Sequence, residues 1–363
     1  MIQEPASTTT RRIEKGKSRR RWIGLVIGVV FALLLAEAAV RIFALGPPTY
    51  QRRRIDPPGG IPLVEANGVW VYRANATFSY IFDPAGDHRG YFGPTGRVIY
   101  RINEHHMRGP AVDVDKPPGT LRVVCLGDSF TFGEGVHYPD TYPARLERLL
   151  SAAHPDRSVE VLNAGVQSYG TDHAVAFYIA HCARFEPDIV TLGFFLNDAT
   201  DARETVRQHG ALIDPPELSP LARLSRLWSI FERRRHAARV RRAYFETTRR
   251  SFDSPQWQKC KDLLGGMQKW SDQDGFRFVV VIFPILWGLD GAYPFEDLHR
   301  RIRRACEDAG CEVIDLLDTY RGRSAQSLWI HPTDQHPNEI AHRLAAERIA
   351  RHLVSSADPA DRK

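Results

Sequence analysis

Five short apolar runs alternate with five segments of helical pattern, and this alternation restricts the possible folds more than any other feature of the chain. The apolar runs cover 121–126, 158–163, 187–195, 277–283 and 312–316. The helical segments cover about 141–153, 170–183, 255–272, 295–309 and 338–354. Alternating strands and helices favour a parallel sheet that is covered by helices on both faces. Near-continuous runs such as FVVVIF at 278–283 are typical of strands buried on both sides, so we predict an α/β fold here.

Small and polar residues follow several of these runs. Ligands of parallel sheets bind beyond the carboxyl ends of the strands, so these residues are the candidates for a functional site. They are Gly127, Asp128 and Ser129 in VVCLGDSFTFGEG, Gly165 in NAGVQSYG, Asn197 and Asp198 in FFLNDATD, and Asp334 and His336 in HPTDQHPNEIAH.

The N-terminal region carries a long apolar segment, RRRWIGLVIGVVFALLLAEAAVRIFAL at 19–45. Its length approaches the roughly 20 residues that a bilayer core requires, and Glu37 and Arg41 are spaced to pair on one helix face. Three arginines directly before the apolar run predict a cytoplasmic N-terminus, with the rest of the chain in the periplasm or outside the cell. The alternative is a cleaved signal peptide, because AEA at 36–38 fits a cleavage site and SRRRW at 18–22 loosely resembles a twin-arginine signal.

These features predict the domain order. We expect a basic cytoplasmic tail at 1–21, a transmembrane anchor at 22–45, a membrane-proximal linker with short strands at 46–118, and a catalytic domain at 119–357. In the linker, aromatic and β-branched residues predict strands within 69–82 and 97–102, whereas GPPTYQRRRIDPPGGIP is unlike a helix.

A basic helical insertion at about 200–254 interrupts the alternation. Leu221, Leu224, Leu227, Trp228 and Phe231 recur at helical spacing within 221–242, and arginines fill the other positions. One interpretation is an amphipathic helix that packs on the domain with a solvated basic face. The other is contact with anionic lipid or an anionic polymer.

The charge and cysteine content exclude some classes of protein. The net charge of +6 is concentrated in local clusters, with seven Arg or Lys in 11–21, and no nucleic-acid-binding motif is present. We therefore expect no nucleic-acid partner. The five cysteines are too few and too scattered for a disulfide framework, and none has metal-site spacing.

The chain resembles the SGNH (GDSL-type) hydrolase family, whose four named residues occur here in family order as Ser129, Gly165, Asn197 and His336. The resemblance covers about 120–355 and implies a flavodoxin-like three-layer α/β/α sandwich with a parallel sheet. The motifs behind an apolar N-terminal segment are also similar to membrane-anchored SGNH proteins of bacterial envelopes. Those relatives include O-acetyltransferases that act on exopolysaccharide.

The predicted site residues have the chemistry of an activated serine. A serine hydroxyl is a poor nucleophile unless a base takes its proton, and the imidazole of His336 suits that task. Asp334 would hold the imidazole tautomer and stabilise the imidazolium. The Ser129 N–H, the Gly165 N–H and the Asn197 amide would donate to the developing oxyanion. Three further residues would support the site: Gly127, Asp128 and Asp198.

Two positions depart from the family pattern. The third block often reads Gly-x-Asn-Asp, but Phe195 stands here in place of the glycine. The usual Asp-x-x-His spacing would place the acid at Thr333, so Asp334 is assigned instead, in an Asp-x-His spacing that acetyltransferase relatives share. Trp287 and Tyr293, after the fourth run, would either line a substrate cleft or pack in the core.

We expect a serine-dependent ester hydrolase that acts outside the cytoplasm through an acyl-enzyme, without a metal or cofactor. Its substrate would be an acylated small molecule or an envelope glycan, and the sequence indicates no particular protein partner. Two alternatives stay open. An O-acetyltransferase would pass the same acyl group to a glycan hydroxyl. A catalytically idle envelope-binding module would keep the fold, although the intact Ser, His and Asp argue against it.

Overall fold

The computed structural model describes residues 8–43, 45, 50–200 and 217–355. The chain divides into two compact units. One unit comprises 1–49 together with 214–242, and the other comprises 50–213 together with 243–363. The predicted insertion at 200–254 therefore contributes to both units, and its part at 201–216 lies outside the described residues.

A five-stranded parallel sheet forms the centre of the larger unit. Its strands are β6 (Leu121–Gly127), β7 (Val159–Gly165), β8 (Ile189–Phe195), β9 (Arg277–Phe283) and β10 (Glu312–Asp315). They lie in the order β10-β9-β8-β6-β7, and every neighbouring pair is parallel. Every residue of β6, β8 and β9 is buried, as the apolar runs predicted. The strand order is the flavodoxin-like one, so the predicted sheet is confirmed.

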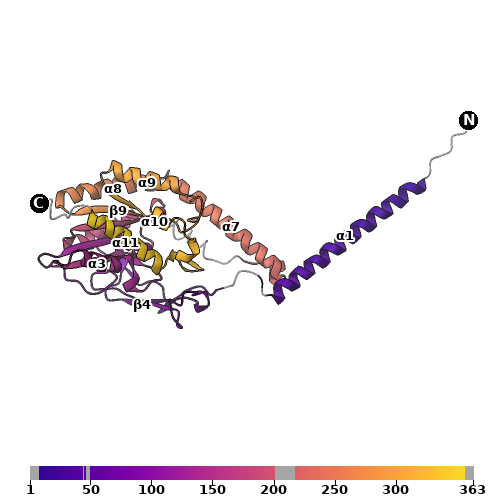
Figure 1. Ribbon diagram of the computed structural model, residues 1–363, viewed down its shortest axis with the longest axis horizontal. Helices are drawn as coiled ribbons and strands as arrows, with labels where there is room; N and C mark the ends of the chain where they lie inside the picture. The colour runs from indigo at the N-terminus through magenta and orange to yellow at the C-terminus, as the bar shows by residue number, and fades with distance from the viewer. Residues whose placement is uncertain (1–7, 44, 46–49, 201–216, 356–363) are drawn as a thin grey trace, which may run out of the picture. The chain divides into compact units, whose positions relative to one another are not determined.

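Helices cover both faces of this sheet. On one face α3 (Tyr142–Ala153) and α11 (Glu339–Ser355) lie side by side, and α8 (Pro255–Asp274) and α9 (Glu296–Asp308) lie on the other, with α4 (Thr171–Phe177) packed beside α8 (Figure 1). The bounds of α8 follow from its sequence. Ser254 accepts a hydrogen bond from the Trp257 N–H and Pro255 occupies the first turn, whereas Gly275 ends the helix with a left-handed φ of 75°. The predicted three-layer α/β/α sandwich is confirmed.

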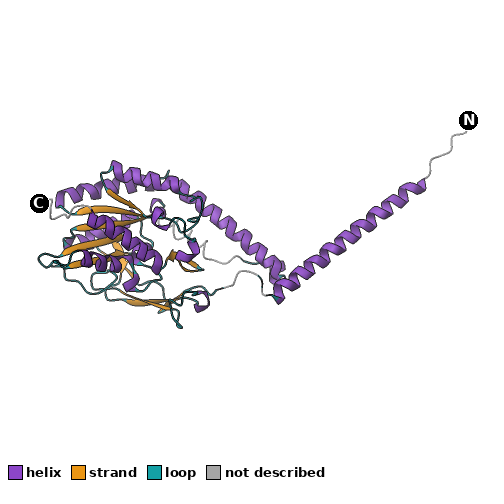
Figure 2. Cartoon of the chain, in the orientation of Figure 1, coloured by secondary structure: helices purple, strands orange, loops and turns teal. Residues whose placement is uncertain are grey.

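Two small antiparallel sheets belong to the same unit and precede the main sheet in the chain. Figure 2 shows the strands of the chain in orange. One contains β1 (Arg54–Asp56), β4 (Thr77–Ile81) and β5 (Arg97–Arg101), and the other is the hairpin of β2 (Leu63–Ala66) and β3 (Val69–Tyr72). β3, β4 and β5 lie within the predicted strand regions, whereas β1 and β2 were not predicted. The rings of Tyr72 and Tyr100 stack on Phe132 with centroids 4.9 and 5.2 Å away. The core of this unit therefore runs across the boundary that the sequence suggested near 118.

Among the described residues of the smaller unit, one helix meets the length and composition of a membrane span. Within α1 (Thr8–Ile42), the segment Arg21–Ile42 is predominantly apolar, and most of its large apolar side chains are exposed, with Val40 buried. A signal sequence meets the same criteria, so the transmembrane anchor and the cleaved signal peptide both stay predictions. The expected Glu37–Arg41 pair is present, with 2.6 Å between Arg41 Nε and Glu37 Oε1.

The basic segment of the insertion forms two helices instead of one. α6 (Pro220–Leu224) ends before Ser225, and α7 (Arg226–Ser251) begins after it. Two groups cap the start of α7. Oγ of Ser225 accepts from the Trp228 N–H at 3.1 Å, and the carboxylate of Glu37 in α1 accepts from the Arg226 and Leu227 N–H groups at 2.8 and 2.9 Å. Apolar side chains of this segment are exposed, including those of Leu221, Leu224, Trp228 and Phe231. Both interpretations of its surface stay predictions.

Candidate active site

Ser129 lies at the turn from β6 into the short helix α2 (Ser129–Phe132). Gly127 makes this turn possible because its φ of 145° lies in a region that side-chain-bearing residues rarely adopt. A Cβ on Gly127 would lie 2.4 Å from Oγ1 of Thr131 and 2.9 Å from the carbonyl oxygen of Gly193. The carboxylate of Asp128 caps α2 by accepting from the Phe130 N–H at 2.9 Å. The local sequence therefore holds the Ser129 side chain in one place.

The structure brings Ser129, His336 and Asp334 into one hydrogen-bonded chain. Nε2 of His336 lies 2.9 Å from Oγ of Ser129, and Nδ1 of His336 lies 2.5 Å from Oδ1 of Asp334. His336 and Asp334 belong to β12 (Asp334–Pro337), which pairs with β11 (Trp329–His331) directly before α11. This order of hydroxyl, imidazole and carboxylate is the geometry that activates a serine for nucleophilic attack.

A buried charge network holds Asp334. The Arg53 guanidinium donates to Oδ2 of Asp334 at 2.5 Å and also contacts Oε1 of Glu134. Burial on its own would raise the pKa of Asp334, but the charge of Arg53 and then that of His336 hold this pKa below its usual range. Glu134, Asp334 and His336 each offer one possible metal-ligand atom, and these atoms lie within 4.8 Å of one another. The positive charge beside the two carboxylates is that of the Arg53 guanidinium.

Two of the predicted oxyanion donors, Asn197 and Gly165, differ in their hydrogen-bond partners. Asn197 follows β8 in the short helix η5 (Leu196–Ala199) and is 8% exposed, and its side-chain Oδ1 has no hydrogen-bond partner among the described residues. The Gly165 N–H instead donates to Oδ1 of Asn163 at 3.2 Å. A Cβ on Gly165 would lie 2.2 Å from the Phe132 nitrogen, so this glycine lets β7 approach α2 closely. Its function as an oxyanion donor stays a prediction.

The two supporting carboxylates are buried. Burial raises the pKa of Asp128 to about 6, and its Oδ2 has no hydrogen-bond partner among the described residues. Burial, followed by the nearby charge of Asp128, raises the pKa of Asp198 well above its usual value. Oδ2 of Asp198 accepts from the Thr171 hydroxyl at 3.0 Å, which ties the loop after β8 to the start of α4.

A mainly apolar cavity of about 270 Å³ opens beside the imidazole. Its walls include Phe130, Phe195, Tyr244, Leu286, Trp287 and His336. The ring of Phe195, at the position where the family often has glycine, stacks on Phe130 with 4.3 Å between centroids. Of the two aromatic residues after β9, Trp287 lines this cavity. Tyr293 is buried, and its hydroxyl accepts from the Ile285 N–H at 2.9 Å.

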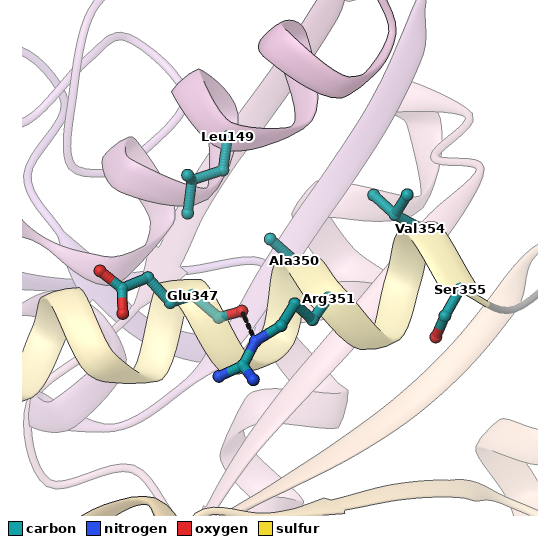
Figure 3. Close-up of a pocket in the computed structure, with 6 residues that line it drawn as sticks. All are labelled: Leu149, Glu347, Ala350, Arg351, Val354 and Ser355. Atoms are coloured by element: carbon teal, nitrogen blue, oxygen red, sulfur yellow. Dashed lines mark hydrogen bonds between the residues drawn. The ribbon is translucent and has the colours of Figure 1, made fainter.

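A second hollow lies between α3 and α11 and contains none of the predicted site residues. It has a volume of about 440 Å³ and is lined by Leu149, Glu347, Ala350, Arg351, Val354 and Ser355 (Figure 3). Arg351 donates to the Glu347 carbonyl at 3.2 Å on the same helix, which is ordinary helix-surface chemistry. The cavity beside His336 is therefore the candidate substrate site.

The family of the chain follows from a family model whose description is the GDSL-like lipase/acylhydrolase family. The model matches residues 125–344, which is more than half of the chain and includes every predicted site residue. The chain belongs to this family. As a GDSL-like acylhydrolase it is an enzyme that hydrolyses ester bonds, and the sequence-based resemblance is confirmed.

Several solved structures are similar to the chain at low sequence identity. No curated protein matches the chain. Among solved structures, acetylxylan esterase Axe2 from Geobacillus stearothermophilus is 15% identical with a TM-score of 0.41, covering 65% of this chain and 95% of its own. The acetyl xylan esterase AlAXEase is 16% identical with a TM-score of 0.42, covering 64% of this chain and 100% of its own. The assignment of this GDSL-like hydrolase rests on the family match and not on these scores.

The sequence prediction missed two charged residues of the site, Arg53 and Glu134. Glu134 lies in the GDSFTFGEG segment, and a carboxylate five residues after the serine was a signal that it lies near the site. Arg53 is the middle one of three consecutive arginines in a Pro/Gly-rich segment, and no local pattern distinguishes it from its neighbours.

Proposed function

We propose that the protein is a serine esterase in which Ser129 forms an acyl-enzyme, His336 transfers the proton and Asp334 orients the imidazole. The observation that carries the proposal is the continuous hydrogen-bonded chain from Oγ of Ser129 through His336 to Asp334. Nε2 of His336 accepts the serine proton as Oγ attacks the ester carbonyl, and then returns it to the leaving alcohol. Water then attacks the acyl-serine: Nε2 of His336 accepts a proton from the water and returns it to Oγ of Ser129.

The developing oxyanion needs donors on the side of the serine. The Ser129 N–H lies at the start of α2, directly after β6, and the Asn197 side chain follows the neighbouring strand β8, which supports both as donors. Gly165 remains the third predicted donor, and it serves only if its N–H exchanges Asn163 for the substrate oxygen. The reaction as proposed uses no metal or cofactor.

A pre-steady-state experiment tests this function. Full-length protein in detergent is mixed with a p-nitrophenyl ester, and the release of p-nitrophenol is followed from the first milliseconds. We expect a burst equal to the enzyme concentration, because acylation then precedes slower deacylation. The burst and turnover should vanish in Ser129→Ala and persist in Ser151→Ala, a matched change at an exposed serine of α3. A burst that survives Ser129→Ala would contradict the proposal, and no burst with any activated ester would favour the binding-module alternative.

Transfer to a glycan hydroxyl is the other possible fate of the acyl-serine. Both reactions share every step up to that intermediate, so only the acceptor separates them. Incubation with an acyl donor and a polysaccharide acceptor, followed by product analysis, distinguishes the two. We expect free acid as the product. If acylated polysaccharide forms instead, the reaction is transfer and not hydrolysis.

We also propose that 1–21 is cytoplasmic, that 22–45 is a membrane anchor, and that the catalytic domain at 119–357 lies outside the cytoplasm. The length of Arg21–Ile42, the exposure of most of its large apolar side chains and the preceding arginines support this topology. The intact mass of the mature protein tests the anchor, since a chain that begins near residue 39 would be a cleaved signal peptide product. Protease digestion of intact spheroplasts tests the orientation, since only an external domain is degraded.

A further inference from the structure

Arg53 and Glu134 lie against the acid of the predicted triad. Nη1 of Arg53 lies 2.5 Å from Oδ2 of Asp334, and the same nitrogen contacts Oε1 of Glu134. That Oε1 lies 3.8 Å from Nδ1 of His336, so two carboxylates face one edge of the imidazole. A single guanidinium therefore stands between two acids beside the base.

The hydrogen bonds of Glu134 are those of an ionised carboxylate. Its Oε1 accepts from Arg53, and its Oε2 accepts from the side-chain amide of Gln167. An ionised carboxylate only accepts hydrogen bonds, whereas a protonated one must place a proton on one of its oxygens. The Glu134 side chain is 3% exposed, so its charge needs the cation that Arg53 supplies.

The small N-terminal sheet holds Arg53 in place. Arg53 directly precedes β1, and its guanidinium lies over the ring of Tyr80 in β4, 4.5 Å from the centroid. The Tyr80 hydroxyl bonds Gln167 at 3.1 Å, and the Tyr72 hydroxyl donates to the same Gln167 at 2.9 Å. The network thus connects the sheet that precedes the catalytic fold with the acid next to the base.

We propose that Arg53 is a positioning residue of the esterase: by bridging Asp334 and Glu134, it fixes the orientation of Asp334 and limits the net negative charge that faces His336. The inference rests on the proposed function, because it assigns His336 as the general base. With Arg53 present, the guanidinium and the two carboxylates sum to one negative charge. Without it, two uncompensated carboxylates face the imidazole.

The charges around His336 set the direction of the effect. The titratable and charged groups on the surrounding segments are Asp334, Glu134, Arg53, Asp128, His331, His342 and, behind Arg53, Tyr80. Burial lowers the pKa of His331 and lowers that of His342 to about 3, so both are neutral near pH 7. A negative charge close to imidazole favours imidazolium, which cannot accept the serine proton. Loss of Arg53 therefore moves the acidic limb of the activity profile to higher pH, and loss of Glu134 moves it to lower pH.

The test is a charge cycle read as pH profiles of kcat/KM for p-nitrophenyl acetate hydrolysis by the full-length protein in detergent. Arg53→Gln should lower kcat/KM at pH 7 at least tenfold and shift the acidic limb upward by about one pH unit or more. Glu134→Gln should shift the limb downward. The double variant Arg53→Gln/Glu134→Gln, which removes both charges and keeps the shape of the pair, should return the limb to within about half a unit of wild type. Arg53→Lys, which keeps the charge, should stay closer to wild type than Arg53→Gln.

The outcomes separate this inference from the proposed function. A loss of activity in Arg53→Gln that is equal at every pH would overturn the charge assignment and give Arg53 a structural role only. No change at all would overturn the assignment too, and would leave Arg53 without a role in the activity. A double variant whose limb stays where Arg53→Gln placed it would overturn it as well. Ser129→Ala is measured alongside: if that variant keeps wild-type activity, the proposed function fails, whatever the Arg53 profiles show. Should Arg53→Gln fail to fold, Glu134→Gln alone still tests the inference, because a purely structural role predicts no downward shift of the acidic limb in that variant.

Discussion

His336 and Ser129 are 207 positions apart in the chain, and Nε2 of His336 lies 2.9 Å from Oγ of Ser129. Ser129 is fixed by the turn after the central strand β6, and His336 by the small β11–β12 pair ahead of α11. The contact therefore depends on the whole three-layer fold and not on any local segment. In the proposed function, the neighbours of this pair decide how well Ser129 works as a nucleophile and His336 as a base.

Asp334→Asn should reduce kcat on the order of 10⁴-fold while the fold is kept. Asp334 accepts from Nδ1 of His336 with one oxygen and from Arg53 with the other. An asparagine must turn its amide N–H₂ toward one of these two donors. It then favours the wrong imidazole tautomer or loses the hydrogen bond from Arg53. Steady-state kinetics measure the effect. Asp318→Asn, at a side chain that is 88% exposed, is the matched control and should retain full activity.

Asp128 should make the protein less stable as the pH rises. Its pKa of about 6 lies above that of an unfolded aspartate, so between about pH 4 and 6 the folded chain holds a proton that the unfolded chain has lost. The free energy of unfolding consequently falls through this window, by roughly 3 kcal/mol for a shift of this size. Asp128→Asn keeps an acceptor for the Phe130 N–H and should raise the melting temperature at pH 7.5 more than at pH 4.5.

Thermal unfolding in detergent at the two pH values measures this difference. Asp198 also has a raised pKa, so Asp128→Asn should reduce the pH dependence without removing it. Equal pH dependence in the wild type and in Asp128→Asn would contradict the account. Asp334 has the opposite shift, and it loses its stabilising contribution only in strong acid, below this window.

Gly127→Ala should both destabilise the protein and displace Ser129. The added Cβ would lie 2.4 Å from Oγ1 of Thr131, at a φ of 145° that disfavours alanine. We expect a loss of about 1–3 kcal/mol in the free energy of unfolding, together with a fall in kcat. Gly265→Ala is the matched control, because Gly265 lies in α8 with nothing within 4 Å of its added Cβ. That change should leave kcat unaltered and stabilise the helix by up to about 1 kcal/mol. Equal stability of the two variants would count against the strained turn.

The cavity beside His336 should favour acyl groups longer than acetyl. Its volume of about 270 Å³ exceeds the roughly 150 Å³ apolar cavity that accepts a benzene molecule. Each buried methylene contributes about 0.8 kcal/mol, so kcat/KM should rise about fourfold per added carbon until the cavity is full. Trp287→Ala should reduce this gain for hexanoate esters and leave acetate esters within about threefold. Trp70→Ala, at an exposed position on β3, should change neither, and a flat profile in the wild type would contradict the prediction.

The sequence predicted the central fold because the information that determines it is local. Fully buried parallel strands require continuous apolar runs, so β6, β8 and β9 could be read directly from the chain. Ser129 and His336 could be proposed as site residues because their motifs follow or flank those elements, and the structure places the two side chains within hydrogen-bond distance. The short strands β1 and β2 could not, because neither is long enough for its pattern to stand out from a Pro/Gly-rich segment.

What the sequence did not predict depends on contacts between distant residues. Glu37 caps the start of α7 across about 190 positions. Arg53 meets Asp334 across 281 positions, and its two neighbouring arginines have the same local pattern. Gly165 lies where the family order placed it, but its N–H already has a partner, Asn163, that only the three-dimensional arrangement reveals.

The most direct test of the central claim is covalent labelling of the full-length protein with a fluorophosphonate, followed by peptide mass spectrometry. The phosphonate is attacked by an activated serine and stays bound to it. We predict one adduct per chain, on the peptide that contains Ser129, with strongly slowed labelling in His336→Ala and none in Ser129→Ala. Labelling at another residue, or undiminished labelling of Ser129→Ala, would contradict the assignment of Ser129 as the nucleophile.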